Sequence, residues 1–168
     1  MTRLAESLSF EDVDLASEYE TRAHRVTADD LVRFGELTHD RHPLHTDDAF
    51  ARSMGFPRRI AHGLFCLALL EGLKSEIGLY ETTSVASLGW DEVRFRKPVF
   101  VDDMLRTRVT FLSKRPSRQP GRGIVVERVE LLNQHGEVVL SAKHVTLLVC
   151  RDVAGGGSDA GARTRNLA

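Results

Sequence analysis

The chain is poor in cysteine, and this shortage limits its chemistry. Only Cys66 and Cys150 occur among 168 residues, and neither belongs to a metal-binding motif. Cys66 falls in an apolar run with helical character, and Cys150 ends an apolar strand. We therefore expect two reduced, structural thiols and no disulfide framework.

Excess charge of one sign and long apolar runs are also missing. The formal net charge is −1, which gives no electrostatic reason to expect nucleic acid or an anionic membrane as a partner. No segment approaches the roughly 18 apolar residues of a membrane span, and the first ten residues lack the apolar core of a signal peptide. We expect a cytoplasmic protein.

The chain divides by composition into a body and two flanking segments. Residues 1–17 are polar and aperiodic, and we interpret them as an N-terminal extension. Residues 152–168 are rich in glycine and almost without large apolar side chains, which predicts a flexible tail. Residues 18–151 contain no internal repeat and no linker, so they predict a single domain.

The first part of this domain combines one strand with short helices. Residues 18–26 read as a strand, and Thr27 with the acidic residues after it is typical of a helix N-terminus. Pro43 fixes its own φ and disfavours helix before it, so residues 40–45 predict a rigid turn. A further short helix is expected over residues 47–54.

The second part predicts one buried helix and a sheet. Residues 63–77 are apolar nearly all round the first two helical turns, and Gly78 is a stop signal. The alternating patterns that follow predict strands over 84–90, 92–99, 105–114, 123–133 and 137–150. We expect an α+β fold in which a curved antiparallel sheet wraps round the helix, with Trp90, Phe95 and Phe111 in the core. One helix leaves sheet edge uncovered, so we also expect a dimer.

Asp40 and His45 are the first candidates for chemistry. They flank the proline-stiffened turn, and a carboxylate beside an imidazole suits water activation or proton transfer. The alternative is a solvated loop in which Asp40 caps a backbone group and His45 packs against a neighbour.

Gly63 is the third candidate residue. It opens the buried helix, where a free N–H can stabilise an oxygen gaining negative charge. Alternatively, Gly63 only lets the helix approach the sheet closely.

A metal site is the competing interpretation of the same turn. His39, His42 and His45 fall at intervals of three beside Asp40, and imidazole with carboxylate suits zinc or iron. Pro43 interrupts any helix that would align these side chains, so we expect no metal.

Several residues together resemble a known family, the MaoC-like dehydratases or (R)-specific enoyl-CoA hydratases, which have the hot-dog fold. The matching positions are Phe34, Thr38, Asp40, Pro43, Leu44, His45, Ala61, His62 and Gly63, followed by residues 93–103. The chain departs from the family signature at His39, where glycine is usual, and at His42, where asparagine is most frequent. These departures concern the size of the substrate pocket.

The resemblance implies addition of water to a trans-2-enoyl thioester, or its reverse, which gives an (R)-3-hydroxyacyl thioester. Asp40 and His45 would be the catalytic pair, and Gly63 would bind the thioester carbonyl oxygen. The implied substrate pocket contains His39, His42, Pro43, His62, Leu64 and Leu67.

It further implies an acyl-CoA or acyl-carrier-protein substrate, no cofactor, and a homodimer or a dimer of dimers. Two alternatives remain: a hot-dog thioesterase, which the five-residue spacing of Asp40 and His45 argues against, and a non-catalytic subunit that binds acyl groups.

Overall fold

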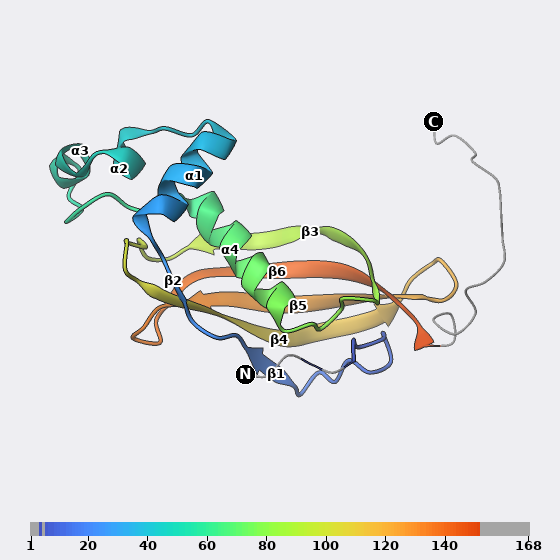
Figure 1. Ribbon diagram of the computed structural model, residues 1–168. Helices are drawn as coiled ribbons and strands as arrows, with labels where there is room; N and C mark the ends of the chain where they lie inside the picture. The colour runs from blue at the N-terminus through green and yellow to red at the C-terminus, as the bar shows by residue number, and fades with distance from the viewer. Residues whose placement is uncertain (1–3, 5, 152–168) are drawn as a thin grey trace, which may run out of the picture.

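A six-stranded antiparallel sheet forms most of the protein in this computed structural model, which describes residue 4 and residues 6–151 (Figure 1). The strands are β1 (Glu18–Glu20), β2 (His24–Arg25), β3 (Ser84–Phe95), β4 (Met104–Pro116), β5 (Arg122–Leu132) and β6 (Val138–Val149). Their order is β1-β4-β5-β6-β3, and β2 also pairs with β4. The predicted flexible tail, residues 152–168, lies outside the described residues.

One helix packs along the sheet, as the sequence predicted. This helix, α4 (Gly63–Glu76), lies over one face of the sheet, and Leu70 at its centre is fully buried (Figure 1). The hydroxyl of Thr107 on β4 donates a hydrogen bond to the Leu70 carbonyl at 3.0 Å, which ties the helix to the sheet. The α+β prediction is confirmed. No helix in the described part of the chain has the length and apolar character to cross a membrane.

Three shorter helices gather where α4 begins (Figure 1). They are α1 (Ala28–Thr38), α2 (Pro43–Thr46) and α3 (Asp48–Ser53). Thr27 caps α1 as predicted: its hydroxyl accepts from the Asp30 N–H at 3.1 Å, and the Asp30 carboxylate accepts from the Thr27 N–H at 2.8 Å. These reciprocal hydrogen bonds satisfy donors that a helix start leaves free.

The turn and the strands differ from the predictions in three places. Pro43 does not only shape a turn but starts α2, because a missing N–H is harmless at the first helical position. The predicted strand over residues 18–26 is interrupted between β1 and β2. The two strands expected over 84–90 and 92–99 form the single strand β3, whose pairing with β6 shifts register at three points.

The burial of Phe95 and of the N-terminal segment differs from the predictions. Phe111 is buried, but Phe95 is 54% exposed, so placing it in the core was wrong. Phe95 ends the edge strand β3, and its ring lies against Gly63 at the start of α4. The segment interpreted as an N-terminal extension packs onto the domain: Val13 is buried, and the Leu8 N–H donates to the Leu79 carbonyl at 2.7 Å.

Replacing Leu70 by alanine tests how far the fold depends on α4. A fully buried leucine reduced to alanine leaves a cavity, so we expect Leu70→Ala to lower the free energy of unfolding by about 2–5 kcal/mol. Leu37→Ala on α1 is the control, because Leu37 is 79% exposed, and surface changes usually stay within about 0.5 kcal/mol. Urea denaturation followed by circular dichroism measures both, and equal effects would contradict the assigned core.

Candidate active site

Three side chains from different segments meet at the start of α4. Asp40 follows α1, His45 lies on α2, and His62 is the N-cap residue of α4. One oxygen or nitrogen atom from each of the three lies within 4.8 Å of the other two. The family resemblance placed His62 in the substrate pocket, and the structure brings it into contact with the predicted pair, Asp40 and His45.

The imidazole of His45 is held with one nitrogen free. Its Nδ1 lies 2.8 Å from the Ile60 carbonyl oxygen, which can only accept, so Nδ1 carries the hydrogen and Nε2 keeps its lone pair. Burial is the main cause that lowers the pKa of His45 below its ordinary value, although the Ile60 hydrogen bond and the charge of Asp40 oppose the shift. His45 is therefore a neutral imidazole at neutral pH and can accept a proton.

His62 contacts both Asp40 and His45. It is 2% exposed, and its Nε2 lies 2.9 Å from the backbone oxygen of Asp40, to which it donates. Its ring lies 3.9 Å from the ring of His45, at an angle of 30°. His62 thus fixes both the Asp40 backbone and the His45 ring. Its Nδ1 is buried and has no hydrogen-bond partner among the described residues.

Helix α1 packs closely against this group. A Cβ added to Gly35 would lie 3.1 Å from the Asp40 carbonyl oxygen, so a side chain there would push Asp40 away. The Phe34 ring lies 5.1 Å from the ring of His62. Sequence reasoning did not identify Gly35, because the contact joins a helix to a loop whose path is set by the whole fold.

His42 and His39 act on the backbone around Asp40. The Asp40 carboxylate accepts from the His42 N–H at 3.3 Å, and Nδ1 of His42 accepts from the Leu44 N–H at 3.3 Å, so His42 caps the helix that carries His45. His39 is exposed and has a φ of 63°, in the left-handed region. Glycine adopts this conformation without strain, which gives a backbone reason for the usual residue of the family signature.

A cavity of about 350 Å³ opens beside His45 and Gly63. Phe95 and Cys66 also line it, and burial raises the pKa of the Cys66 thiol to about 12, so this thiol is not a nucleophile at neutral pH. A Cβ on Gly63 would lie 3.0 Å from the Phe95 ring, so glycine permits their close approach. None of the six residues of the predicted substrate pocket lines this cavity: His39, His42, Pro43, His62, Leu64 and Leu67.

The same three residues are also the candidates for a metal site. Asp40, His45 and His62 are the one described group with the spacing of metal ligands, and His62 takes the place that His39 and His42 held in the sequence argument. His42 instead uses Nδ1 as a helix cap. That the protein needs no metal stays a prediction, which elemental analysis of purified protein tests.

Comparison with known families assigns the chain. The family model described as "MaoC like domain" matches residues 13–131. The chain belongs to this family. The MaoC-like assignment and the hot-dog fold predicted from the sequence are thereby confirmed.

Named relatives of this MaoC-like protein include hydratases. It is 34% identical over 149 residues to the mesaconyl-CoA hydratase of Cereibacter sphaeroides. This match covers 86% of this chain and 42% of that protein. It is 28% identical over 131 residues to the (R)-specific enoyl-CoA hydratase of Aeromonas caviae, covering 74% of this chain and 87% of the relative. The chain therefore spans under half of the first relative and most of the second.

Solved structures agree with this assignment. The crystal structure of a monoamine oxidase regulatory protein from Archaeoglobus fulgidus has a TM-score of 0.80 and 31% identity, and the match covers 86% of this chain and 95% of that chain. The fold of this structure therefore agrees with the MaoC-like assignment.

The titration of His45 tests the electrostatics of the site. Because burial lowers its pKa, we expect the midpoint to lie below the ordinary value of 6.5. Asp40→Asn removes a charge that favours imidazolium, so the midpoint should move still lower. NMR of the imidazole nitrogens measures the midpoint in both proteins. The His45→Gln variant identifies the signals that belong to His45. A midpoint above 6.5, or an upward shift in Asp40→Asn, would contradict this account.

Proposed function

We propose that this MaoC-like protein is a hydro-lyase that interconverts trans-2-enoyl thioesters and (R)-3-hydroxyacyl thioesters. The observation that carries the proposal is the meeting of a carboxylate, Asp40, and a neutral imidazole, His45, beside the first N–H of a buried helix at Gly63. The carrier of the acyl group is CoA or an acyl carrier protein. The names of the hydratase relatives support this reaction class.

The geometry supports a single-site addition of water. Asp40 and Nε2 of His45 would hold one water molecule over the β-carbon of the enoyl group. The water oxygen bonds to that carbon, one water proton passes to the pair, and the pair delivers a proton to the α-carbon on the same face. Because the two groups interact, they act as one unit in proton transfer.

Gly63 would supply the electrophilic half of the reaction. As water adds, negative charge develops on the thioester oxygen, and the first N–H groups of α4 have no partner within the helix. A positioned backbone donor and the positive end of the helix dipole stabilise this enolate character. The thioester itself makes the α-proton acidic, so the proposal requires no cofactor.

Substitution of the catalytic pair tests the mechanism. We expect Asp40→Asn and His45→Gln each to lower the turnover of crotonyl-CoA by about 10²-fold or more, since each removes a proton-transfer group. The loss of enoyl-thioester absorbance measures hydration, and chiral analysis of the product tests the (R) configuration. Asp29→Asn, at an exposed position on α1, is the control. Near-normal turnover in either catalytic variant would contradict the mechanism. Release of free CoA without hydration would favour a thioesterase.

We also propose that the protein is a homodimer that pairs through β3. In the described chain β3 pairs only with β6, and its other edge is uncovered. Val85 and Leu88 on this strand are 43% and 50% exposed. A free edge with exposed apolar side chains is a surface that proteins cover by pairing.

The oligomeric state follows from this edge. Light scattering coupled to gel filtration should give a mass of twice 18.8 kDa, or a higher multiple for a dimer of dimers. Leu88→Lys should shift the protein towards the monomer, because a buried unpaired charge opposes association. Leu15→Lys, at a position 47% exposed outside β3, is the control. A monomeric wild-type protein would contradict the proposal.

A further inference from the structure

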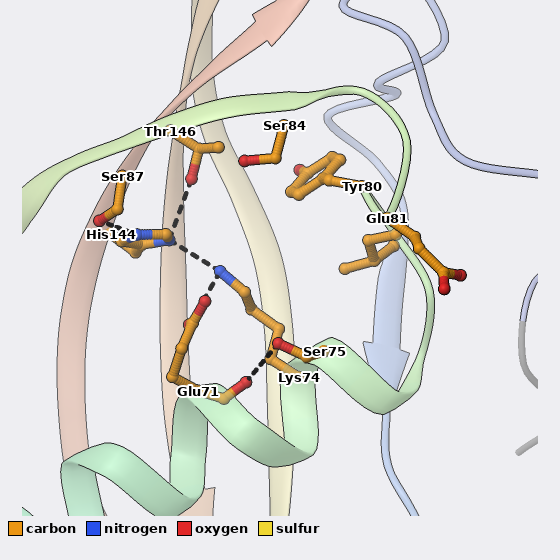
Figure 2. Close-up of a pocket in the computed structure, with 10 residues that line it drawn as sticks. Glu71, Lys74, Ser75, Tyr80, Glu81, Ser84, Ser87, His144 and Thr146 are labelled. Atoms are coloured by element: carbon orange, nitrogen blue, oxygen red, sulfur yellow. Dashed lines mark hydrogen bonds and ion pairs between the residues drawn. The ribbon is translucent and has the colours of Figure 1, made fainter.

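The buried charges at the end of α4 far from Gly63 already neutralise one another. Figure 2 shows the cavity there, of about 290 Å³, and Lys74 that lines it. Nζ of Lys74 donates to Oε2 of Glu127 at 2.9 Å and to Nδ1 of His144 at 2.7 Å. Oε2 of Glu71 lies 3.1 Å from the same Nζ. Two carboxylates thus surround one ammonium group, and Lys74 is not available to an anionic ligand.

A groove on the opposite face of the sheet presents other cations. Glu127 on β5 and His144 on β6 contact α4, so the residues after them face away from the helix, because side chains alternate along a strand. The groove on that face has a volume of about 270 Å³. The lining residues used below are Glu92, Arg94, Arg96, Arg128, Ser141 and Lys143.

Both carboxylates of this groove already have cationic partners. Glu92 accepts from Nζ of Lys143 at 2.5 Å. Glu130, which also lines the groove, accepts from Arg108 outside it at 2.8 Å. Among the residues that the structure describes, the other cations of the groove make no ion pair: Arg94, Arg96 and Arg128. The groove therefore carries three positive charges that its own carboxylates do not neutralise.

Two of its cations are placed against each other. Arg128 lies directly opposite Lys143 in the pairing of β5 with β6, and like charges at such positions destabilise a sheet. An anion bound between the two side chains would remove this repulsion. Nε of Arg96 donates to the Ser141 hydroxyl at 3.0 Å, which places the Arg96 guanidinium on the same side of the sheet. The arrangement costs stability in the empty protein and suits an anionic ligand.

Arg96 connects the groove to the candidate active site. It lines both the groove and the cavity beside His45 and Gly63. Arg94 precedes it by two residues, or about 7 Å along β3, and Arg128 lies two strands away, or about 10 Å across the sheet. A substrate arm that leaves the cavity at Arg96 can therefore reach the groove around the end of β3. Both ends of this path belong to one chain.

We propose that this groove binds the phosphate groups of the acyl carrier, and that Arg94, Arg96 and Arg128 hold them. A guanidinium presents paired N–H donors that match phosphate oxygens, and it stays charged at physiological pH. The thioester then lies in the cavity beside His45, and the phosphorylated end of the same carrier lies in the groove. The inference rests on the proposed hydration of enoyl thioesters, because that reaction brings the carrier to the cavity.

Two carriers present this chemistry. CoA bears a diphosphate and a 3′-phosphate, whereas a carrier protein presents the single phosphate of phosphopantetheine. Three guanidiniums without carboxylate partners match several phosphate charges better than one. We therefore expect CoA to gain more from the groove than phosphopantetheine does.

A series of crotonyl thioesters that differ only in the carrier tests this inference. The carriers are CoA, 3′-dephospho-CoA, 4′-phosphopantetheine and pantetheine. We expect kcat/KM to fall by roughly tenfold, through KM rather than kcat, at each step that removes a charged hydrogen bond. A loss at the first step identifies the 3′-phosphate as a ligand, and a loss confined to the last step identifies the phosphate that phosphopantetheine shares with CoA. Equal kcat/KM across the series would overturn the inference.

Ionic strength and variants test the residues. Salt screens exposed charges, so KM for crotonyl-CoA should rise with ionic strength and that for crotonyl-pantetheine should change little. Arg94→Gln and Arg128→Gln should each raise KM for crotonyl-CoA by roughly tenfold, and far more than they raise it for crotonyl-pantetheine. Arg118→Gln, at an exposed position in the loop between β4 and β5, is the control. Urea denaturation should show that Arg128→Gln does not lower stability, because it removes the repulsion with Lys143.

Binding of free CoA distinguishes this inference from the proposed function. Calorimetric titration with CoA and with pantetheine requires no hydration. If no thioester is hydrated but CoA binds roughly tenfold more weakly to Arg128→Gln than to Arg118→Gln, the hydration proposal falls and the groove is supported. If crotonyl-CoA is hydrated and both variants bind CoA like the wild-type protein, the groove is overturned alone.

Discussion

Burial of α4 against the sheet is the constraint on which the candidate active site depends. A helix packed along a sheet has two ends, and each leaves backbone groups and side chains without partners inside the helix. At the first end the chain provides Gly63, whose lack of a Cβ lets Phe95 approach. At the other end it buries Lys74 and surrounds it with acceptors from β5 and β6. The same packing therefore produces an N–H site at one end of α4 and a buried ion pair at the other.

The chemistry of the first end depends on how two imidazole rings are held. His45 and His62 each use one ring nitrogen to donate to a backbone carbonyl, which fixes their tautomers and leaves the other nitrogen without a hydrogen. The charge of His62 is among the causes that lower the pKa of His45, because like charges at close range repel. The site is thus arranged to receive a proton at neutral pH.

Local patterns in the sequence were enough for most of the fold. The apolar run of α4, the cap at Thr27 and the alternation in β4, β5 and β6 each carry their own signal, and the structure agrees with them. Continuity of β3 was missed because Glu92, with a φ of 51°, interrupts the alternation without ending the strand. Asp40 and His45 were predictable because they are five residues apart on one turn. Gly35 and His62 join them only through tertiary packing.

The polar group around Lys74 lay beyond sequence reasoning for the same reason. Lys74 is 53 residues from Glu127 and 70 residues from His144 in the chain, and a lysine in the last turn of a helix is usually a solvated end. Removing one partner of a buried ion pair leaves an uncompensated charge and typically costs about 3–5 kcal/mol, so the pairing of Lys74 with Glu127 contributes to the stability of this end of α4. Glu71 is the most exposed of these partners, with 39% of its side chain accessible, and it makes no hydrogen bond to Lys74. The partners of Lys74 come from α4, β5 and β6, so only the complete fold assembles this buried group.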